Sequence, residues 1–426
     1  MGVDRQGVRE VIKAVEADDV ERARRLVADA DVRRGVNERL GAFDSPAINH
    51  VKSREMLDVL LEAGADINAR STWWAGGFGL LDLAAPDVAA YAIERGATVD
   101  AHAAARLGLT DALQRLLATD SQLVHARGGD GQTPLHMAGS IEAADLLITA
   151  GADLNARDVD HESTPAQYMV RDRQEVARHL VARGCRTDLL MTAALGDLDR
   201  TRRHLDADPT CIEMRVNDRW FPRTNPHAGG TIYNWTLDSH ASAHQVAKRF
   251  GHSEVLELLF ERAAPVARVA EACLIEDEGA VRAFRATVPS LADALSADQR
   301  RLIAHAARNN QTRAVALLLE SGWPVDARGQ HEGTPLHWAG FHGNLEMARE
   351  ILRFNPPLEA IDGDFKGTPL GWTIYGSENG WYASTGKHAE TVDVLLKEGA
   401  TRPRDIGGSA AVRAVLERKS WTDPSG

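Results

Sequence analysis

The chain has 426 residues and a formal net charge of −12 at pH 7, from 49 Lys and Arg against 61 Asp and Glu. An acidic surface of mixed sign argues against a nucleic-acid backbone as the main partner. No apolar run approaches the roughly 18 residues that a membrane-spanning helix needs. We therefore expect neither nucleic acid nor a membrane as a partner.

The N-terminal residues include acidic side chains and no apolar stretch, which excludes a secretory signal. Three cysteines, Cys185, Cys211 and Cys273, are widely spaced along the chain. An odd number at such spacing excludes a disulfide framework and a four-cysteine zinc site. These features predict a cytoplasmic location.

Helical segments are predicted along the whole chain. In chain order they are an N-terminal cap and first helix pair at 8–40, Ala-rich helices at 101–108, 190–197, 266–277 and 300–310, an amphipathic helix at 313–320, and a C-terminal cap helix at 409–421. An amphipathic second helix follows each Ala-rich one, as 313–320 follows 300–310. No Pro/Ser/Gly-rich linker interrupts the series, which predicts a single array over residues 1–426.

The string TPLH occurs twice, at Thr133–His136 and Thr334–His337, with degraded copies at 45–47, 164–166 and 368–370. Thr133 lies 31 residues before Thr164, and Thr334 lies 34 residues before Thr368. In each copy Thr or Ser can cap a helix through its hydroxyl, and Pro then occupies the first helical position, where a missing N–H costs nothing. A fixed period near this length is typical of a solenoid.

A second string, LL-x-x-GA-x-x-NAR, closes the units at 60–70, 147–157 and 318–328, and is weaker at 93–100, 181–188 and 395–404. Gly64, Gly151 and Gly322 each follow a Leu-rich segment in these copies. A glycine there suits the left-handed residue that ends many helices.

Together these strings resemble the ankyrin repeat over nearly the whole chain. The resemblance implies an all-α solenoid of about twelve helix pairs with short β-hairpin-like fingers, in which neighbouring pairs stack because one pair cannot bury its own apolar face. It also implies that His136 and His337 hold the hairpins by hydrogen bonds, and that fingers and first helices line a concave face. Most ankyrin repeats mediate protein–protein interaction.

Long insertions enlarge the array at 71–79, 158–163, 217–238 and 376–386. Five of the nine tryptophans lie in them, and two more follow the TPLH positions on first helices. We expect these and neighbouring residues to converge on one aromatic surface or pocket that binds a ligand. The predicted ligand-binding residues are Trp73, Trp74, Phe78, Trp220, Tyr233, Trp235, His331, Trp338, Phe341, His342, Asp364, Trp372, Tyr375 and Trp381. Alternatively, these rings fill small cores within the long fingers themselves.

Acidic residues and a histidine crowd the finger at 158–163. Asp158, Asp160, His161 and Glu162 are candidates for acid–base chemistry, because crowding of ionisable groups separates their pKa values. They could also hold a divalent ion. The structural alternative is a turn in which aspartate accepts hydrogen bonds from the backbone. Asp160 is the best single candidate to face the concave surface.

Other chemical sites are weaker. His240 and His244 have the i, i+4 spacing of metal ligands, but Ser242 aligns with the capping Thr, so His240 is expected to precede the helix and His244 to be a core histidine. The chain has no phosphate-loop string, no G-x-S-x-G and no zinc motif, and no cysteine has a visible histidine partner. No cofactor is expected and no residue is assigned as a metal ligand.

Two functions follow from these observations. The first is a binding protein whose aromatic-rich concave face or pocket holds a protein segment or a small apolar or ring-shaped molecule. The alternative is an unusual enzyme on the same fold, which uses the finger carboxylates and His161 on such a molecule. Enlarged fingers that meet over a cavity containing Asp160 or His161 would favour the small-ligand or enzyme alternative.

Overall fold

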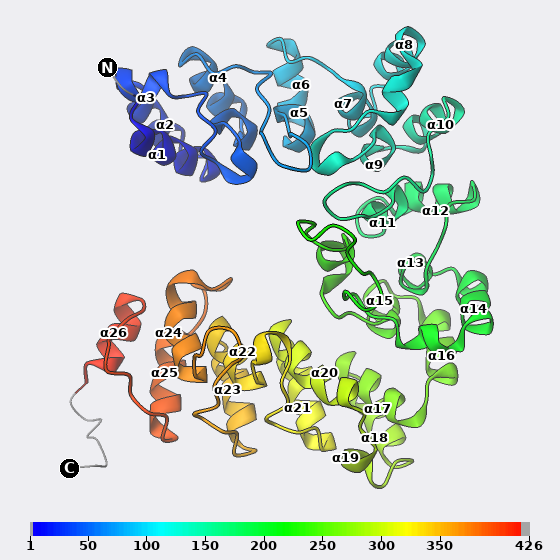
Figure 1. The fold of residues 1–426 in the computed structure, drawn as a ribbon, viewed down its shortest axis with the longest axis vertical. Coiled ribbons are helices and arrows are strands. Elements are labelled where there is room, and N and C mark those ends of the chain that lie inside the picture. Colours follow the sequence, from blue (N-terminus) through cyan, green and yellow to red (C-terminus); the bar gives the residue numbers. More distant parts are fainter. Residues whose placement is uncertain (1–2, 419–426) are drawn as a thin grey trace. The chain divides into compact units, whose positions relative to one another are not determined.

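The computed structural model describes residues 3–418. The chain divides into two compact units, one formed by Met1–Leu195 with Val216–Ser239 and the other by Gly196–Arg215 with His240–Gly426 (Figure 1). The predicted C-terminal cap at 409–421 corresponds to α26 (Ala410–Leu416), and residues 419–421 of that prediction lie outside the described residues. That the whole chain forms one array stays a prediction.

The first unit is built from short helices (Figure 1). They are α1 (Arg5–Glu16), α2 (Val20–Val27), α3 (Ala30–Arg34), η1 (Ala42–Asp44), η2 (Ala47–His50), α4 (Arg54–Glu62), α5 (Leu80–Leu83), α6 (Pro86–Glu94), α7 (Ala101–Arg106), α8 (Thr110–Thr119), η3 (Ser121–His125), η4 (Gly129–Gly131), α9 (Pro134–Met137), α10 (Ile141–Thr149), α11 (Pro165–Met169), α12 (Gln174–Ala182), α13 (Leu189–Leu195) and the π-helical turn η6 (Asn234–Asp238).

The second unit repeats the same pattern. Its helices are α14 (Leu198–Ala207), η5 (Pro209–Glu213), α15 (Ala243–Arg249), α16 (Ser253–Arg262), α17 (Pro265–Leu274), α18 (Glu278–Arg285), α19 (Leu291–Ala294), α20 (Ala297–Arg308), α21 (Thr312–Ser321), η7 (Gln330–Glu332), α22 (Pro335–His342), α23 (Leu345–Leu352), α24 (Pro369–Asn379), α25 (His388–Lys397) and α26.

Helix pairs stack in two layers within each unit. First helices pack on first helices, as α7 on α9 and α9 on α11 in the first unit, and α20 on α22 and α22 on α24 in the second. Second helices do the same, as α8 on α10 and α21 on α23. Residues 3–418 form no β-strand, so the predicted all-α repeat fold is confirmed. None of the described helices combines the length and apolar character that a membrane span requires.

The TPLH copies form the predicted caps. The Thr133 and Thr334 backbone N–H groups donate to Nδ1 of His136 and His337, each at 3.1 Å. The opposite nitrogen of His136 lies 3.0 Å from the Ser163 carbonyl oxygen in the next finger. These histidines therefore tie one finger to the next, as the resemblance implies.

Glycines end the second helices as predicted, since Gly64, Gly151 and Gly322 have φ of 91°, 97° and 103°. Side chains with a Cβ rarely adopt this conformation. The fingers are tight turns closed at the base by one backbone hydrogen bond, such as Gly128 N–H to the Gln132 carbonyl at 2.9 Å.

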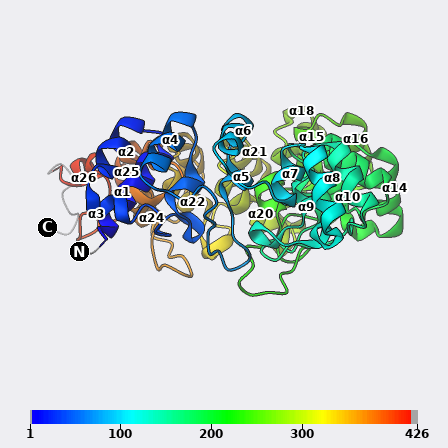
Figure 2. The same ribbon diagram turned by 90° about the horizontal axis from the view of Figure 1, so that it is seen from above.

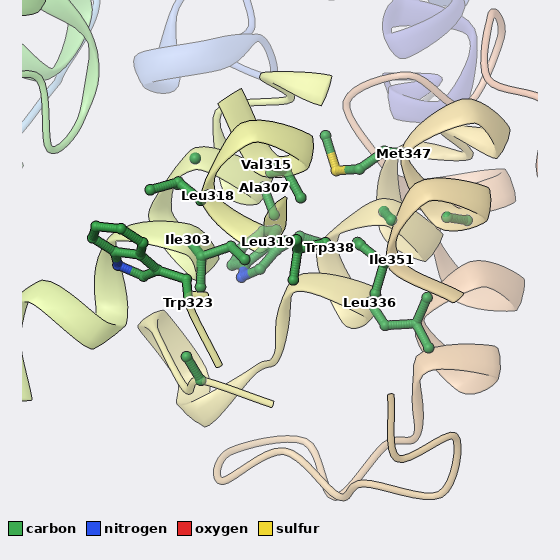
Figure 3. Close-up of a cluster of buried hydrophobic side chains, with 14 of the residues drawn as sticks. Ile303, Ala307, Val315, Leu318, Leu319, Trp323, Leu336, Trp338, Met347 and Ile351 are labelled. Atoms are coloured by element: carbon green, nitrogen blue, oxygen red, sulfur yellow. The ribbon is translucent and has the colours of Figure 1, made fainter. Parts of the chain in front are cut away.

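The apolar core of the second unit lies between its two layers of helices. Ile303 of α20, Val315 of α21, Leu336 of α22 and Met347 of α23 are fully buried against one another (Figure 3). Burying each such side chain contributes about 1.5–3 kcal/mol. This packing makes the first helices a rigid platform for the side chains on their outer faces.

One helix is unusually short, and another differs from the sequence-based boundaries. Helix α9 has a single turn because Ser140, four residues after His136, already caps α10 by accepting from the Ala143 N–H. The predicted insertion at 376–386 begins inside α24, which continues to Asn379. Gly376 lies in that helix, where a Cβ would lie 2.3 Å from the Phe341 carbonyl oxygen. Glycine at this position therefore permits the close packing of α24 on α22.

Candidate functional site

Equivalent finger positions come together within each unit. The residue three positions before the capping Thr is Asp130, His161, His331 or Phe365 in four of the fingers. Asp130 and His161 belong to neighbouring fingers of the first unit, and His331 and Phe365 to neighbouring fingers of the second. The repeat thus places residues about one period apart side by side.

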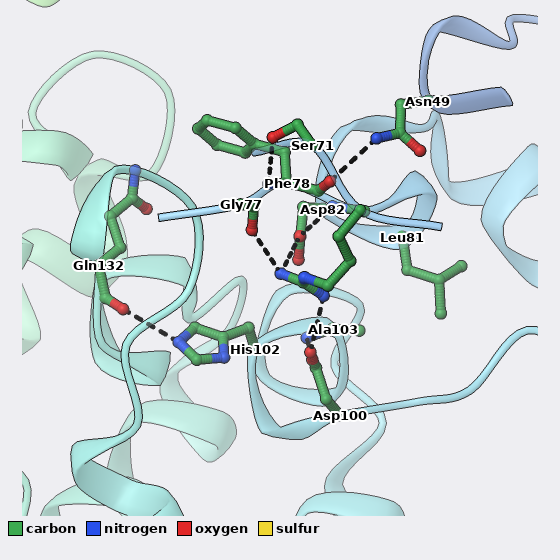
Figure 4. A network of polar contacts seen from close by, with 12 residues as sticks. Asn49, Ser71, Gly77, Phe78, Leu81, Asp82, Asp100, His102, Ala103 and Gln132 are labelled. Atoms are coloured by element: carbon green, nitrogen blue, oxygen red, sulfur yellow. Dashed lines mark hydrogen bonds and ion pairs between the residues drawn. The ribbon is translucent and has the colours of Figure 1, made fainter. Parts of the chain in front are cut away.

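The finger at 71–79 is held by a polar network (Figure 4). The Arg70 guanidinium donates to the Gly77 carbonyl at 2.7 Å and to Asp82 Oδ2 at 2.8 Å. The Phe78 N–H donates to Ser71 Oγ, and the Asn49 amide donates to the Phe78 carbonyl. This finger therefore presents its aromatic side chains from a fixed backbone.

The long insertion at 217–238 is bound to the finger at 158–163. Glu162 accepts hydrogen bonds from the N–H groups of Thr224 and Asn225, at 3.0 and 2.7 Å. These bonds lower the pKa of Glu162 although its partial burial acts in the opposite direction. Asp160 Oδ1 accepts from the Gly229 N–H at 3.1 Å. Figure 2 shows long connections of the first unit, in blue and green, that project beyond its helices.

Asp158 has a structural position in this finger. Its Oδ2 accepts from the His161 N–H and the Tyr168 hydroxyl, at 2.7 and 3.0 Å, and its Oδ1 accepts from the Ser163 N–H at 2.7 Å. The two backbone bonds close the turn, which is the structural alternative that the sequence left open, and the Tyr168 bond ties the turn to α11. Asp158 and Glu162 are thus engaged within the protein.

Asp130, Asp160 and His161 form a compact cluster. His161 Nε2 lies 3.7 Å from both Asp130 Oδ2 and Asp160 Oδ2, and one ligand atom from each of the three residues lies within 4.8 Å of the others. The side chain of Asp130 is 13% exposed and that of His161 is 10% exposed. Asp130 Oδ1 and the Trp73 indole nitrogen are buried without a hydrogen-bond partner.

Electrostatics at this cluster disfavour a second negative charge. Burial raises the pKa of Asp130 to about 6, against the lowering effect of His161, and the nearby carboxylates of Asp160 and Asp158 raise it further. Trp73 lowers it to a smaller extent. Such a carboxyl group exchanges its proton near neutral pH, which suits acid–base chemistry.

Aromatic side chains surround the cluster. The Trp235 ring, which is exposed, lies 4.6 Å from the His161 ring. Trp73 contacts Phe43 and Trp74, with ring centroids 5.1 and 6.3 Å apart. The hollow beside His161 has a cavity volume of about 10 Å³, room for about one water molecule and far less than a small-molecule site needs.

Two predicted ligand-binding residues of the insertion have other surroundings. Tyr233 is fully buried, its ring contacts Phe221, and its hydroxyl donates to Asp188 Oδ2 at 3.0 Å. It therefore fills the small core of the insertion and has no surface for a ligand, contrary to the prediction. Trp220 is half-buried, with the Arg219 guanidinium 5.7 Å above its ring.

The second unit gathers a separate group of rings. Phe365, Tyr375, Trp381 and Tyr382 are 67%, 60%, 60% and 38% exposed, respectively. We call these four residues the aromatic face. Phe365, Trp381 and Tyr382 contact the rings beneath them, and Tyr375 is included because it lies on α24 three residues after Trp372. Beneath and beside it lie the buried or half-buried side chains of His331, Trp338, Phe341, His342 and Trp372. Ring contacts connect the two layers, such as Phe341 to Trp381 at 5.6 Å and Phe365 to Trp372 at 6.0 Å.

Charged groups hold this second group in place. The Arg308 guanidinium carbon lies 5.1 Å from the Trp381 ring centroid and 5.8 Å from that of Trp338. The predicted residue Asp364 is hydrogen-bonded to His331, with Oδ2 2.7 Å from Nδ1. That the rings of both units share one pocket stays a prediction.

His240 precedes α15, as predicted, and its ring stacks on that of His305 with centroids 3.5 Å apart. His244 is buried with its Nδ1 3.8 Å from Glu271 Oε2. The two histidines thus have different partners, in keeping with the structural alternative. Burial raises the pKa of Cys211 and Cys273 to about 11, which disfavours a thiolate at either site.

Sequence reasoning missed Asp130 and Arg308. Asp130 lies in the glycine-rich finger 128–131, three positions before Thr133, and the period alone would have paired it with His161. Arg308 carries no motif, since it lies at the end of an Ala-rich helix and contacts Trp381 from the insertion after α24.

Comparison with known proteins identifies the repeat. Residues 101–192 and 243–362 match the family described as ankyrin repeats (3 copies). This chain is an ankyrin-repeat protein. Palmitoyltransferase Hip14 of Drosophila melanogaster is 30% identical over 99 residues, which cover 23% of this chain and 14% of that protein. The chain thus spans about one seventh of that relative's length. Ankyrin repeats indicate a protein-binding role.

Proposed function

We propose that this ankyrin-repeat protein binds an extended segment of a partner protein on the aromatic face of its second unit. The observation that carries the proposal is the exposure of three large rings, Phe365, Trp381 and Tyr382, that contact a layer of buried or half-buried aromatic side chains. Exposed apolar groups that gather in one place usually mark an interaction site.

The arrangement of Trp381 supports the proposal energetically. Its ring contacts Trp338 at 6.1 Å and Phe341 at 5.6 Å, and Arg308 lies over it. A side chain already held in place loses little conformational entropy when a partner binds. Tryptophan, tyrosine and arginine are also the residue types that most often dominate binding energy at interfaces.

The test uses short random peptides selected on the wild-type protein. We expect selected peptides to bind the full chain. Trp381→Ala should raise their dissociation constant about 30-fold, which corresponds to a loss of about 2 kcal/mol in binding free energy. The matched control is Trp235→Ala, because Trp235 is a similarly exposed tryptophan in an insertion of the first unit. That control should leave the dissociation constant within twofold.

The peptide experiment also distinguishes other outcomes. Equal losses for Trp381→Ala and Trp235→Ala would contradict a site confined to the aromatic face. Unchanged binding of Trp381→Ala would contradict the proposal itself. Thermal unfolding of each variant, expected to match the wild type within a few degrees, shows that any loss reflects the contact surface.

A small-molecule or enzymatic role rests on the first unit. Its support is the cluster of Asp130, Asp160 and His161, which has a carboxyl group suited to proton exchange. The adjoining hollow, of about 10 Å³, has no room for a ring-shaped substrate. The peptide-binding role therefore has the stronger support, and the enzymatic role stays a prediction.

A further inference from the structure

In the cluster of Asp130, Asp160 and His161, three atoms that carry lone pairs face one another, and no N–H or O–H group lies between them. The Gly230 carbonyl oxygen can only accept a hydrogen bond, and it lies 2.9 Å from His161 Nδ1. Nδ1 therefore carries the hydrogen, and in the neutral ring Nε2 presents a lone pair. That lone pair faces Asp130 Oδ2 and Asp160 Oδ2, each 3.7 Å away.

Two side chains of the cluster are largely buried and lack hydrogen-bond donors where they face each other, which indicates that a positive charge belongs between them. The His161 side chain is nine-tenths buried, and the structure gives its Nε2 no hydrogen bond. Asp130 Oδ2, which faces His161, also has no hydrogen-bond donor, while the other oxygen, Oδ1, is buried with the Trp73 indole N–H as its neighbouring donor. Buried acceptors that face one another repel unless a proton or a cation lies among them.

We propose that Asp130, Asp160 and His161 bind one divalent first-row cation of the Zn²⁺ or Mn²⁺ type. This site goes beyond the peptide-binding function and belongs to the other unit. Imidazole nitrogen favours such ions over Ca²⁺ and Mg²⁺, which prefer oxygen ligands alone. Zinc bonds of about 2.1 Å would place neighbouring ligand atoms roughly 3.0–3.5 Å apart, close to the 3.7 Å between His161 Nε2 and each of the two carboxylate oxygens.

The surrounding contacts resemble those that orient metal ligands in proteins. Histidine ligands usually donate their other ring N–H to a carbonyl or carboxylate, as His161 does to Gly230. Asp160 is oriented by the Gly229 N–H at 3.1 Å. Residues of the insertion thus fix two of the three ligands from outside the cluster, which gives the long insertion a positioning role.

The site implies a measurable consequence of ion binding. Zinc binds carboxylate and imidazole ligands in their deprotonated forms, so zinc and protons compete for these three side chains. Zinc binding also stabilises the folded state, because the ion binds the assembled ligands more tightly than the unfolded chain. Both effects are independent of any catalytic activity.

The experiment is calorimetric titration of the full chain, first dialysed against EDTA, with ZnCl₂ and separately with MnCl₂, MgCl₂ and CaCl₂. We expect one Zn²⁺ per chain, with Mn²⁺ weaker and the other two ions at least tenfold weaker than Zn²⁺. Asp130→Asn and His161→Gln should each weaken zinc binding at least tenfold and abolish the zinc-dependent rise in unfolding temperature.

Controls and X-ray absorption keep the proposal falsifiable. Asp44→Asn and His125→Gln change exposed residues of the same unit and should bind zinc as the wild type does. The zinc edge spectrum should show nitrogen and oxygen ligands near 2.0–2.1 Å. Sulfur ligands in that spectrum, unchanged zinc binding by Asp130→Asn and His161→Gln, or no wild-type binding of zinc or manganese would each overturn the proposal.

Discussion

Replacing Asp130 by Asn should stabilise the first unit at neutral pH in metal-free buffer. The folded pKa of Asp130 is raised from 3.8 to about 6, chiefly by burial. At about 1.4 kcal/mol for each pKa unit, an ionised Asp130 destabilises the folded state by about 3 kcal/mol. Asparagine carries no charge and tolerates the left-handed φ of 54° at this position, so the change removes the charge and keeps the backbone.

The sign of the pH dependence follows from the raised pKa. Below about pH 4 both the folded and the unfolded state hold the proton, and the wild type and Asp130→Asn should differ little. Between about pH 4 and 6 the unfolded state ionises first, so the wild type loses stability relative to the variant as the pH rises. Above about pH 6 the difference should be constant at about 3 kcal/mol.

The assay is urea unfolding at pH 4 and pH 7 in EDTA. Hydrogen exchange of peptides from each unit monitors the unfolding, so that the transition of the first unit can be assigned. The control is Asp44→Asn, because Asp44 is an exposed aspartate with a similar φ of 50°. A variant Asp130→Asn that is less stable than the wild type at pH 7, or equally shifted at both pH values, would refute the reasoning.

Three further predictions concern buried polar groups. Glu271→Ala should destabilise the second unit by about 3–5 kcal/mol in urea unfolding, because it leaves the half-buried Arg215 without its ion pair. The double variant Glu271→Leu/Arg215→Met should recover most of that loss, and no recovery would contradict the ion-pair explanation. His136→Ala should cost about 2–4 kcal/mol, since it removes bonds to Thr133 and Ser163, and a loss under 0.5 kcal/mol would be incompatible with a role in tying the fingers. The pKa values of His240 and His305 are lowered to about 4 and about 2, mainly by burial, so the second unit should lose stability as pH falls from 6.5 towards 4, and a double replacement by Gln should reduce that loss.

Much of the fold was predictable because short-range interactions between neighbouring residues define the repeat. The capping Thr, the following Pro and the closing Gly each act within one turn of chain, and Thr334, Pro335 and Gly322 have the roles that their positions predict. The truncation of α9 and the continuation of α24 were harder to predict. They depend on where the next cap falls and on the contact of Gly376 with the neighbouring helix, neither of which is local to the element itself.

The candidate site was predictable only in part. Asp160 and His161 were singled out from one crowded finger, but their partner Asp130 comes from the preceding finger and needed the repeat register to be found. Tyr233 illustrates the opposite error, since a ring in a long insertion can serve the core of that insertion. Aromatic residue type therefore indicated where rings gather but not which of them reach the surface.

The most direct test of peptide binding is the NMR spectrum of the tryptophan indole N–H groups as a selected peptide is added. The proposed function predicts shifts at Trp381 and at its neighbours Trp338 and Trp372, whose rings contact one another. Trp74 and Trp235 of the first unit should keep their free-state signals. Shifts confined to Trp74 and Trp235, with Trp381 unchanged, would contradict binding on the aromatic face.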